Sequence, residues 1–559
     1  MKSFWPVFFS LPILFIACET QPAYDLVLTN GTIYDGSGSG PYIGAVAIQS
    51  DTLAYVGKDV AIGGKTVVDV KGKAIAPGFI NMLSWAVESL IQDGKSQSDI
   101  RQGVTLEVFG EGMSWGPLNE RMKEEMKKQQ GDFTYPVAWN SLGEYLEFLE
   151  KRGVSCNVAS FVGATTLRVH EVGYEDRPPS PEELDTMKQL ARKAMEEGAV
   201  GIGSSLIYAP AFYAKTDELI ELCKVAAEYD GMYISHLRSE SNRFLQALDE
   251  LIRIAKESGI RAEIYHLKAG GAQNHPKMDL AIQKIDSARM TGLEITTDMY
   301  NYIAGATGLD AAMPPWVQEG GYEAWRKRLQ DPFIRNKVKK EMMTDTDAWE
   351  NLYFMAGAEG VVLNGFKNEG LRKYTGKTLA EVAGILGSTP EEAAMDLVIQ
   401  DGSRVGAVYF LMSEENVKKQ LKLPYMSFGS DAGSLAPEGS FLNYNPHPRA
   451  YGNFARLLGK YVRDEQVIPL EDAIFKLTHL SALKLRIKKR GLLQPGYFAD
   501  VVVFDPEAIQ DHATFEDPHQ YATGMIHVFV NGEQVLKDGE HTGATPGRVV
   551  RGPGWKGEG

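Results

Sequence analysis

Carboxylate and imidazole side chains follow several short apolar runs in the middle of this 559-residue chain. Glu111, His236 and His266 each come within two residues of the end of such a run, and Asp431 follows another. Imidazole nitrogens and carboxylate oxygens suit a divalent ion such as zinc. A carboxylate outside the ligand set can move protons. These residue types predict a metal site on Glu111, His236 and His266, with Asp431 as the proton-transferring group.

The two histidines share a local frame that sets them apart among the ten histidines of the chain. Each is followed by a leucine and then by a basic residue, in Ser235–Arg238 and in Tyr265–Lys268. A lone histidine at a strand end is more often a hydrogen-bonded structural residue. Two of them at matching positions of consecutive strands favour metal binding, and we interpret the other eight as structural or surface residues.

These side chains can meet only if the runs that carry them are neighbouring strands. Eight short apolar runs recur, and helical patterns separate several of them; the clearest helix is Pro181–Gly198, capped by Ser180. This alternation predicts an α/β fold, a parallel (β/α)8 TIM barrel in which all strand ends converge on one mouth. The runs are Phe79–Leu83, Thr105–Phe109, Asn157–Val162, Val200–Ile207, Met232–Ser235, Ala262–Tyr265, Leu293–Thr297 and Tyr425–Phe428.

The two ends of the chain have a different pattern from the middle. Residues 22–75 and 485–559 alternate apolar and polar positions and carry turn signals such as Asn30-Gly31. We expect them to form one small composite β-sandwich domain beside a barrel at 76–484. The gap after the seventh run is too long for one helix, so we expect an insertion at 310–375 near the barrel mouth.

The net charge of −15 leaves no basic surplus to neutralise phosphates, which argues against a nucleic-acid partner. Residues 1–18 join one lysine to a short apolar run and end in Ala17-Cys18, resembling a lipoprotein-type signal peptide. We expect export to the periplasm or cell envelope, with a lipid anchor at Cys18 as the only membrane contact. Plain secretion is the alternative. Cys156 and Cys223 are expected to be buried free thiols.

Ten blocks of sequence resemble, in order, the amidohydrolase superfamily and within it the N-acyl-D-amino-acid deacylases, or D-aminoacylases. The resemblance covers nearly the whole chain after residue 24. The blocks are YDLVLTNGTIYDGSG (24–38), APGFI (76–80), VGATTLR (162–168), GAVGIGSSLIYAPAFYAKTDEL (198–219), YISHLRSE (233–240), YHLKAGG (265–271), DMYNY (298–302), GSDAG (429–433), HPRAYGNFARLLGKYVR (447–463) and RGLLQPGYFADVVVFDP (490–506).

The chain departs from this superfamily at its first barrel strand. Family members end that strand in His-x-His, where this chain has Leu83 and Trp85. They also place a metal-binding cysteine after the second strand, where this chain has Glu111. The resemblance implies that Glu111, His236 and His266 keep the tighter metal site. It therefore predicts an enzyme with one divalent metal ion, zinc being the expected ion. Some N-acetylglucosamine-6-phosphate deacetylases are similar in this respect.

The resemblance implies a hydrolase that cleaves the linear amide of an N-acyl-D-amino acid. The metal would lower the pKa of a water molecule, and Asp431 would serve as general base and then as general acid. The substrate carboxylate requires cationic partners, for which Lys268 and Arg449 are candidates, with Tyr300 as a hydrogen-bond donor. Arg238 is a further candidate, with a salt bridge at the rim as its alternative.

Two other functions remain open at the level of sequence. The same scaffold could hydrolyse another amide, as a D-residue dipeptidase, an amino-sugar deacetylase or a cyclic amidase. The chain could also be a non-catalytic binding lipoprotein that lost its first-strand histidines. Retention of Glu111, His236, His266 and Asp431 argues against the second possibility, because binding alone needs no such set.

Overall fold

A computed structural model of the chain describes residues 1–5 and 24–557. The expected signal peptide at 1–18 lies largely, and its Cys18 entirely, outside the described residues. Within the described residues, no helix has the length and apolar character needed to cross a membrane. Cys156 and Cys223 are buried and unpaired, as expected.

A closed parallel barrel forms the centre of the described chain. One sheet has the order β17-β13-β12-β11-β10-β9 and another the order β6-β7-β8, with all pairs parallel. β8 and β9 follow each other as one stave, and a bridge between Ser84 and Ala432 closes the ring. The eight predicted runs thus form the staves β6 (Phe79–Asn81), β7 (Val104–Phe109), β8 (Asn157–Ser160), β9 (Val162–Gly163), β10 (Gly201–Ser205), β11 (Met232–His236), β12 (Arg261–Ile264), β13 (Ile295–Met299) and β17 (Met426–Phe428).

Helices cover the outside of the barrel, and their ends follow from local sequence. In α6 (Pro181–Glu196), the Ser180 side chain accepts from the backbone of Glu183 and the Glu183 side chain accepts from that of Ser180, a complete capping box. Its buried stripe packs on the barrel. Further helices around the barrel are α4 (Leu142–Arg152), α5 (Ala164–Glu171), α7 (Thr216–Ala227), α8 (Phe244–Ser258), α9 (Lys277–Met290), α15 (Glu414–Leu421), α17 (Leu470–Leu477) and α18 (His479–Leu485).

The two chain ends build one β domain, as predicted. Within residues 24–557, nine strands pair in the order β21-β20-β19-β18-β5-β1-β2-β3, with β4 also paired to β1. The strands are β1 (Tyr24–Ile33), β2 (Tyr42–Gln49), β3 (Thr52–Gly57), β4 (Gly64–Asp69), β5 (Ala74–Pro77), β18 (Val501–Phe504), β19 (Met525–Val530), β20 (Glu533–Lys537) and β21 (Glu540–His541). The junction is the antiparallel pair β5–β18, so Ala76 and Pro77 belong to this sheet rather than to the barrel.

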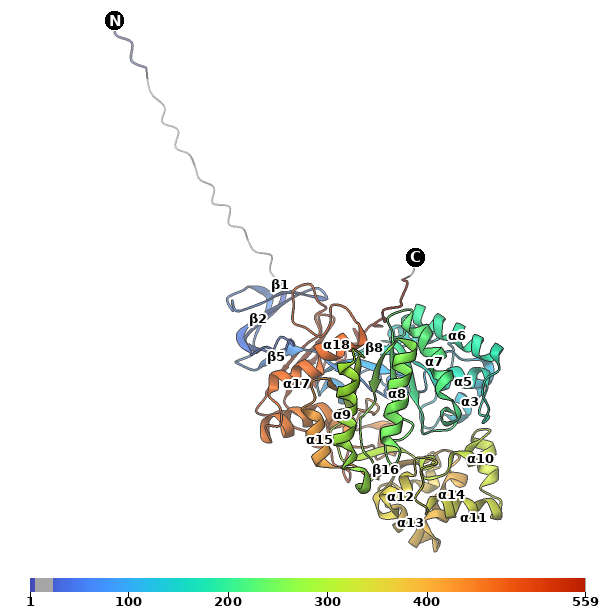
Figure 1. The fold of residues 1–559 in the computed structure, drawn as a ribbon. Helices are drawn as coiled ribbons and strands as arrows, with labels where there is room; N and C mark the ends of the chain where they lie inside the picture. The colour runs from blue at the N-terminus through green and yellow to red at the C-terminus, as the bar shows by residue number, and fades with distance from the viewer. Residues whose placement is uncertain (6–23, 558–559) are drawn as a thin grey trace.

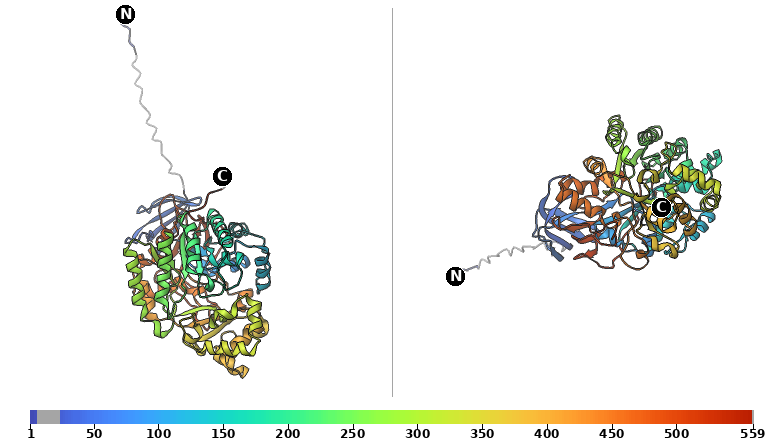
Figure 2. Two further views of the ribbon diagram at one scale, coloured as in Figure 1. Left: turned by 45° about the vertical axis from the view of Figure 1, so that its right-hand side comes forward. Right: turned by 90° about the horizontal axis from the view of Figure 1, so that it is seen from below.

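The insertion is longer than the expected 310–375. The insertion extends from β14 (Ala304–Gly308) to β16 (Gly406–Phe410). Its antiparallel sheet has the order β14-β16-β15, with β15 (Val361–Gly365) at one edge. Its helices enclose a separate hydrophobic core and lie at the end of the molecule opposite the β domain (Figures 1 and 2). They are α10 (Tyr322–Arg328), α11 (Pro332–Met342), α12 (Leu352–Ala356), α13 (Leu379–Leu386) and α14 (Pro390–Asp401).

The C-terminal tail corrects the expected β-domain range of 485–559. Pro546 and Val549 form parallel bridges to Val154 and Val158, on the β8 side of the barrel. A Cβ at Gly547 would lie 2.0 Å from the carbonyl oxygen of Cys156, so this close approach requires glycine. The tail therefore pairs with the barrel, although Pro546 and Arg548 also contact Asn531 and Asp51 in the turns of the composite sheet.

A cavity of about 730 Å³ opens where the barrel strands end. Its wall combines residues that follow barrel strands, such as Glu111 and His266, with insertion residues such as Thr307 and Tyr322. The C-terminal ends of parallel strands are where barrel enzymes carry their chemistry. The fold therefore places the predicted metal ligands and the insertion around one shared space.

Candidate metal centre

Three buried side chains from three barrel strands converge in this cavity. Glu111 follows β7, His236 ends β11 and His266 follows β12. One ligand atom from each lies within 4.8 Å of the others. Glu111 Oε1 is 3.2 Å from His236 Nδ1 and 2.9 Å from His266 Nε2. Two imidazole nitrogens and one carboxylate oxygen that meet at a buried point are a donor set that fits a zinc ion.

The Glu111 carboxylate is kept ionised and is oriented by a hydrogen bond. Burial alone would raise the pKa of Glu111, but the positive charge of His266 and hydrogen bonds from both histidines hold it well below its ordinary value. Its second oxygen, Oε2, accepts a hydrogen bond of 2.9 Å from Trp85 Nε1. At a position where the resemblance implies a metal ligand in other family members, Trp85 thus supplies an N–H donor that orients the Glu111 carboxylate.

The backbone is strained at two of the predicted site residues. His266 has φ +32° and Asp431 has φ +49°, a region that side-chain-bearing residues rarely adopt. The His266 N–H donates to Asp298 Oδ1 at 2.7 Å, and the Asp431 N–H donates to the Leu83 carbonyl at 2.8 Å. Asp298 thus orients a neighbour and Leu83 fixes the eighth-strand loop, which is how surrounding structure maintains such strain.

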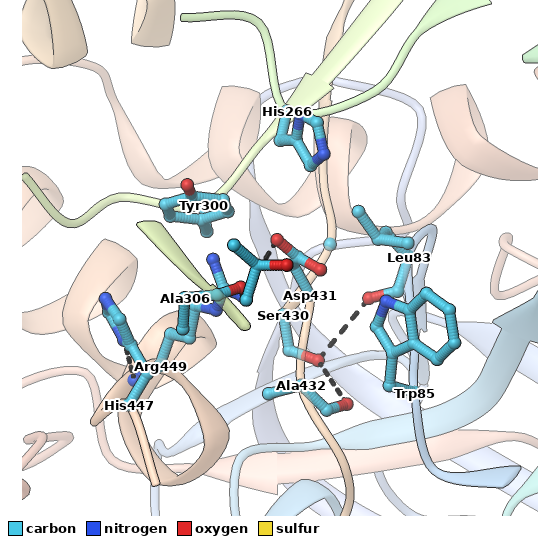
Figure 3. A network of polar contacts seen from close by, with 12 residues as sticks. Leu83, Trp85, His266, Tyr300, Ala306, Ser430, Asp431, Ala432, His447 and Arg449 are labelled. Atoms are coloured by element: carbon cyan, nitrogen blue, oxygen red, sulfur yellow. Dashed lines mark hydrogen bonds and ion pairs between the residues drawn. The ribbon is translucent and has the colours of Figure 1, made fainter. Parts of the chain in front are cut away.

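Asp431 points into the cavity beside Arg449. Figure 3 shows Asp431 with Tyr300 and Arg449 on one side and with Leu83 and Trp85 on the other. Arg449 Nη2 lies 2.8 Å from Asp431 Oδ2. Burial raises the pKa of Asp431 to about 6, against the lowering effect of the Arg449 charge. A carboxyl group with that pKa is suited to exchange protons near neutral pH.

Arg449 keeps donors free for a ligand. It is almost fully buried, its guanidinium lies 4.2 Å from the centre of the Tyr300 ring, and it lines the cavity. Its Nε and Nη1 have no hydrogen-bond partner among the described residues. Within the described part of the chain, Tyr300 donates only to the sulfur of Met412, a weak acceptor at 3.6 Å. Arg449 and Tyr300, both predicted as substrate contacts, thus have hydrogen-bonding capacity to spare.

Lys268 also lines the cavity, but its ammonium is already engaged. Nζ lies 2.7 Å from Glu240 Oε2, 2.7 Å from His266 Nδ1 and 3.2 Å from the His266 carbonyl oxygen. Burial alone would lower the pKa of Lys268, but the negative charge of Glu240 holds it above its ordinary value. The lysine is therefore a buried cation whose three donors already face protein acceptors.

Arg238, predicted as a possible substrate contact, does not reach this site. It forms a bidentate pair with Glu250, at 2.7 and 2.8 Å, and donates to the carbonyls of Phe212 and Ala214. It lines a separate polar cavity beside α7 and α8. The chain leaves the strand at His236, so the next basic residue turns away from the barrel axis. The salt-bridge alternative is correct.

Two acidic residues of the site were missed from sequence. Glu240 is buried and contacts both predicted histidine ligands as well as Lys268. Glu350, from the insertion, accepts hydrogen bonds from Ser239 and Ser241 and lines the same cavity. Glu240 stands in the block YISHLRSE, four residues after His236, which was the one available signal. Glu350 has no local pattern, because a distant insertion brings it to the site.

A parallel barrel, a β domain made from both termini, and a carboxylate–histidine–histidine cluster at the barrel mouth together define an amidohydrolase. Residues 336–536 match the model of the Amidohydrolase family. The chain is 32% identical to the D-aminoacylase of Alcaligenes xylosoxydans xylosoxydans over 536 residues, 95% of this chain and 98% of that enzyme. It therefore belongs to the D-aminoacylase family, hydrolases of carbon–nitrogen bonds other than peptide bonds.

Two solved structures share the whole architecture. A D-aminoacylase, described by one-metal activation and second-metal attenuation of its binuclear centre, matches with a TM-score of 0.77 at 30% identity. It covers 94% of this chain and 100% of its own. The N-acyl-D-glutamate deacylase of Bordetella bronchiseptica, complexed with zinc and a phosphonate mimic of the tetrahedral intermediate, also gives 0.77, at 28% identity. That match covers 95% of this chain and 100% of the deacylase.

Proposed function

We propose that this protein is a one-metal deacylase that hydrolyses N-acyl-D-amino acids to a carboxylic acid and a free D-amino acid. The carrying observation is the convergence of Glu111, His236 and His266 beside Asp431 in one cavity of a chain related end to end to D-aminoacylases. For one such relative, a D-aminoacylase with a binuclear metal centre, one-metal activation and second-metal attenuation are described. Leu83 and Trp85 cannot bind a second ion, which supports a single site here.

Glu111, His236 and His266 would hold the ion, zinc being the proposed metal. When bound, a zinc ion acts as a Lewis acid, which lowers the pKa of a water molecule and polarises a carbonyl group. Trp85 keeps the Glu111 carboxylate oriented for that task. All three ligand side chains are buried, which strengthens the electrostatic interactions among them.

Asp431 would move the proton. As a general base it accepts a proton from water while the water oxygen bonds to the amide carbon. As a general acid it returns that proton to the nitrogen as the carbon–nitrogen bond breaks, so the amine leaves neutral. Arg449 holds the carboxylate in place through Oδ2. The free Nε and Nη1 donors of Arg449 and the Tyr300 hydroxyl would bind the substrate carboxylate.

A substrate panel tests the function. Zinc-loaded protein is incubated with N-acyl-D- and N-acyl-L-amino acids, and the released amino acid is analysed on a chiral column. We expect D products only, with Asp431→Asn lowering kcat about 100-fold or more and Glu111→Ala abolishing zinc binding. Glu250→Gln, which removes a carboxylate outside the cavity, serves as the matched control. Full activity of both site variants, or of exhaustively chelated protein, contradicts the proposal.

The size of the cavity favours a substrate larger than an N-acetyl amino acid. Its volume of about 730 Å³ is in the upper part of the roughly 300–1,000 Å³ typical of small-molecule sites. The panel therefore extends to long acyl groups and to dipeptides with a D-residue, the second candidate class. Absence of bound metal together with absence of hydrolysis across the panel would favour a non-catalytic binding protein instead.

We also propose that the enzyme is exported and carries a lipid on Cys18. The support is the sequence alone: a lysine, a short apolar run and a small residue before the cysteine. Labelling of cells with a radioactive fatty acid tests it, because the parent should take up label and Cys18→Ala should not. Equal labelling of both, or recovery of both from the cytoplasm, overturns the proposal.

A further inference from the structure

Glu240 is a buried carboxylate that lines the same cavity, and the proposed reaction assigns it no role. It lies in the segment that leads from β11 to α8, and it is 4% exposed. Its oxygens lie 3.3 Å from His236 Nε2, 3.1 Å from His266 Nδ1 and 2.7 Å from Lys268 Nζ. An unpaired buried charge is costly, and these three nitrogens are the groups that can compensate the charge of Glu240.

The nitrogens that Glu240 faces are the ones turned away from Glu111. Glu111 Oε1 contacts Nδ1 of His236 and Nε2 of His266. A histidine that binds a metal through one nitrogen carries its hydrogen on the other, where a carboxylate commonly accepts it. Here one carboxylate lies against both of those outer nitrogens. Neither imidazole contact of Glu240 is yet a hydrogen bond: among the described residues, His236 Nε2 and Glu240 Oε1 have no hydrogen-bond partner, so both remain available.

Lys268 is affected by the same carboxylate. Its Nζ lies 2.7 Å from both Glu240 Oε2 and His266 Nδ1. A nitrogen that carries a hydrogen for Glu240 cannot also accept one from Lys268. When His266 has its hydrogen on Nδ1, Lys268 retains Glu240 and the His266 carbonyl as acceptors, and its third N–H is left without an acceptor among these groups. The arrangement that fits a metal ligand thus also frees a substrate donor.

The insertion fixes Glu240 from outside. Glu350 accepts from the Ser239 hydroxyl at 2.9 Å, the Ser241 hydroxyl at 2.6 Å and the Glu240 backbone N–H at 3.1 Å. These bonds bracket Glu240 on both sides in sequence. Buried hydrogen bonds of this kind restrict the rotamers of the residue they enclose. Glu350 therefore holds in place the loop that carries the carboxylate.

We infer that Glu240 is a positioning residue that sets the tautomers of both histidine ligands and aligns Lys268, with Glu350 supporting it from the insertion. This inference rests on the proposed metal site but not on the identity of the substrate. It assigns Glu240 no proton transfer and no direct contact with the ion. Carboxylates in this position typically change metal affinity by 10–100-fold when replaced.

The first test measures zinc affinity by competition with a chromophoric chelator. We expect Glu240→Gln to weaken binding 10–100-fold, because the amide can accept a hydrogen bond from only one of the two imidazoles. Glu350→Gln should weaken binding less, since it acts only through the loop. KM for the substrate should also rise in Glu240→Gln, as Lys268 loses its anionic partner.

Glu250→Gln is the matched control, since Glu250 pairs with Arg238 close to the same segment but outside the cavity. It should bind zinc as the parent does. Parent-like zinc affinity in Glu240→Gln overturns the inference and leaves the proposed deacylase standing. A parent protein that binds no zinc overturns both. Tight zinc binding without turnover of any substrate overturns the proposed function alone.

A second measurement needs no variant. In a crystal structure of the zinc-loaded parent, the ion should be bound by Nδ1 of His236 and Nε2 of His266. Glu240 should lie within hydrogen-bond distance of the two opposite nitrogens. Zinc bound through those opposite nitrogens, or a Glu240 carboxylate turned away from both rings, overturns the inference even if Glu240→Gln does not fold.

Discussion

At the scale of single residues, Asp431 is subject to two opposed influences. Burial raises its pKa to about 6 and the Arg449 charge lowers it. A general base must be ionised, so kcat/KM should fall about tenfold per pH unit below pH 6 and level off above it. Arg449→Met removes the lowering charge, and the acid limb should move to higher pH. A pH–rate profile of each protein measures the acid limb of the parent and that of Arg449→Met.

The control for that profile is Arg238→Met, which removes an arginine paired outside the cavity. Its acid limb should coincide with that of the parent. An acid limb that stays in place in Arg449→Met would show that Asp431 is not the group that titrates. Because Arg449 is also a proposed substrate contact, the position of the limb is diagnostic and the absolute rate is not.

The residues that sequence alone could predict are those at the ends of regular strands. Glu111, His236 and His266 were found because each closes an apolar run, and the structure brings them together. Glu240 was missed because it lies in an irregular segment. There, neither the two-residue repeat of a strand nor the roughly 3.6-residue repeat of a helix predicts which way a side chain points. For the same reason, the sequence left Arg238 open between a substrate contact and the salt bridge that it forms with Glu250.

At the scale of elements, the segment after the first barrel strand supplies no metal ligand, but its Trp85 orients the ligand that follows the second strand. Trp85→Phe keeps the ring but removes the hydrogen bond to Glu111 Oε2. Hydrogen bonds to charged groups contribute about 1.5–3 kcal/mol, so zinc affinity should fall about tenfold or more. Trp139→Phe is the matched control, since the buried Trp139 Nε1 has no partner to lose among the described residues. Equal zinc affinity of the two variants contradicts this role.

The eight barrel strands were predictable because each is a compact apolar run between helical patterns. The bounds of the insertion were not. Its first strand, β14, reads AGATG, which has almost no β-forming or apolar character, and tertiary pairing with β16 alone makes it a strand. The bridges of Pro546 and Val549 to the barrel are equally invisible, because contacts nearly 400 residues apart leave no local pattern.

At the scale of the whole molecule, buried carboxyl groups make stability depend on pH. Glu107 lies inside the barrel on β7, accepts a hydrogen bond from Ser84, and burial raises its pKa from 4.5 to about 7. The folded state therefore favours the neutral acid. Its contribution is complete below pH 4.5 and is lost as pH rises to about 7, on the order of 3 kcal/mol.

Glu107→Gln mimics the neutral acid, so its unfolding free energy should fall less than that of the parent between pH 5 and pH 8. Urea unfolding of both proteins at saturating zinc measures the difference, because the metal contribution is common to both. Parallel pH dependence of the two proteins would contradict the assignment to Glu107.

The junction of β5 with β18 also governs how the polypeptide can be made. These two paired strands are separated by more than 400 residues, so β5 cannot pair with β18 until late in synthesis. A nascent chain on the ribosome lacks the partner for the β5 edge until synthesis has passed residue 504. This sheet can therefore be completed only late in synthesis, and until then the unpaired edge of β5 is open to pairing with other chains.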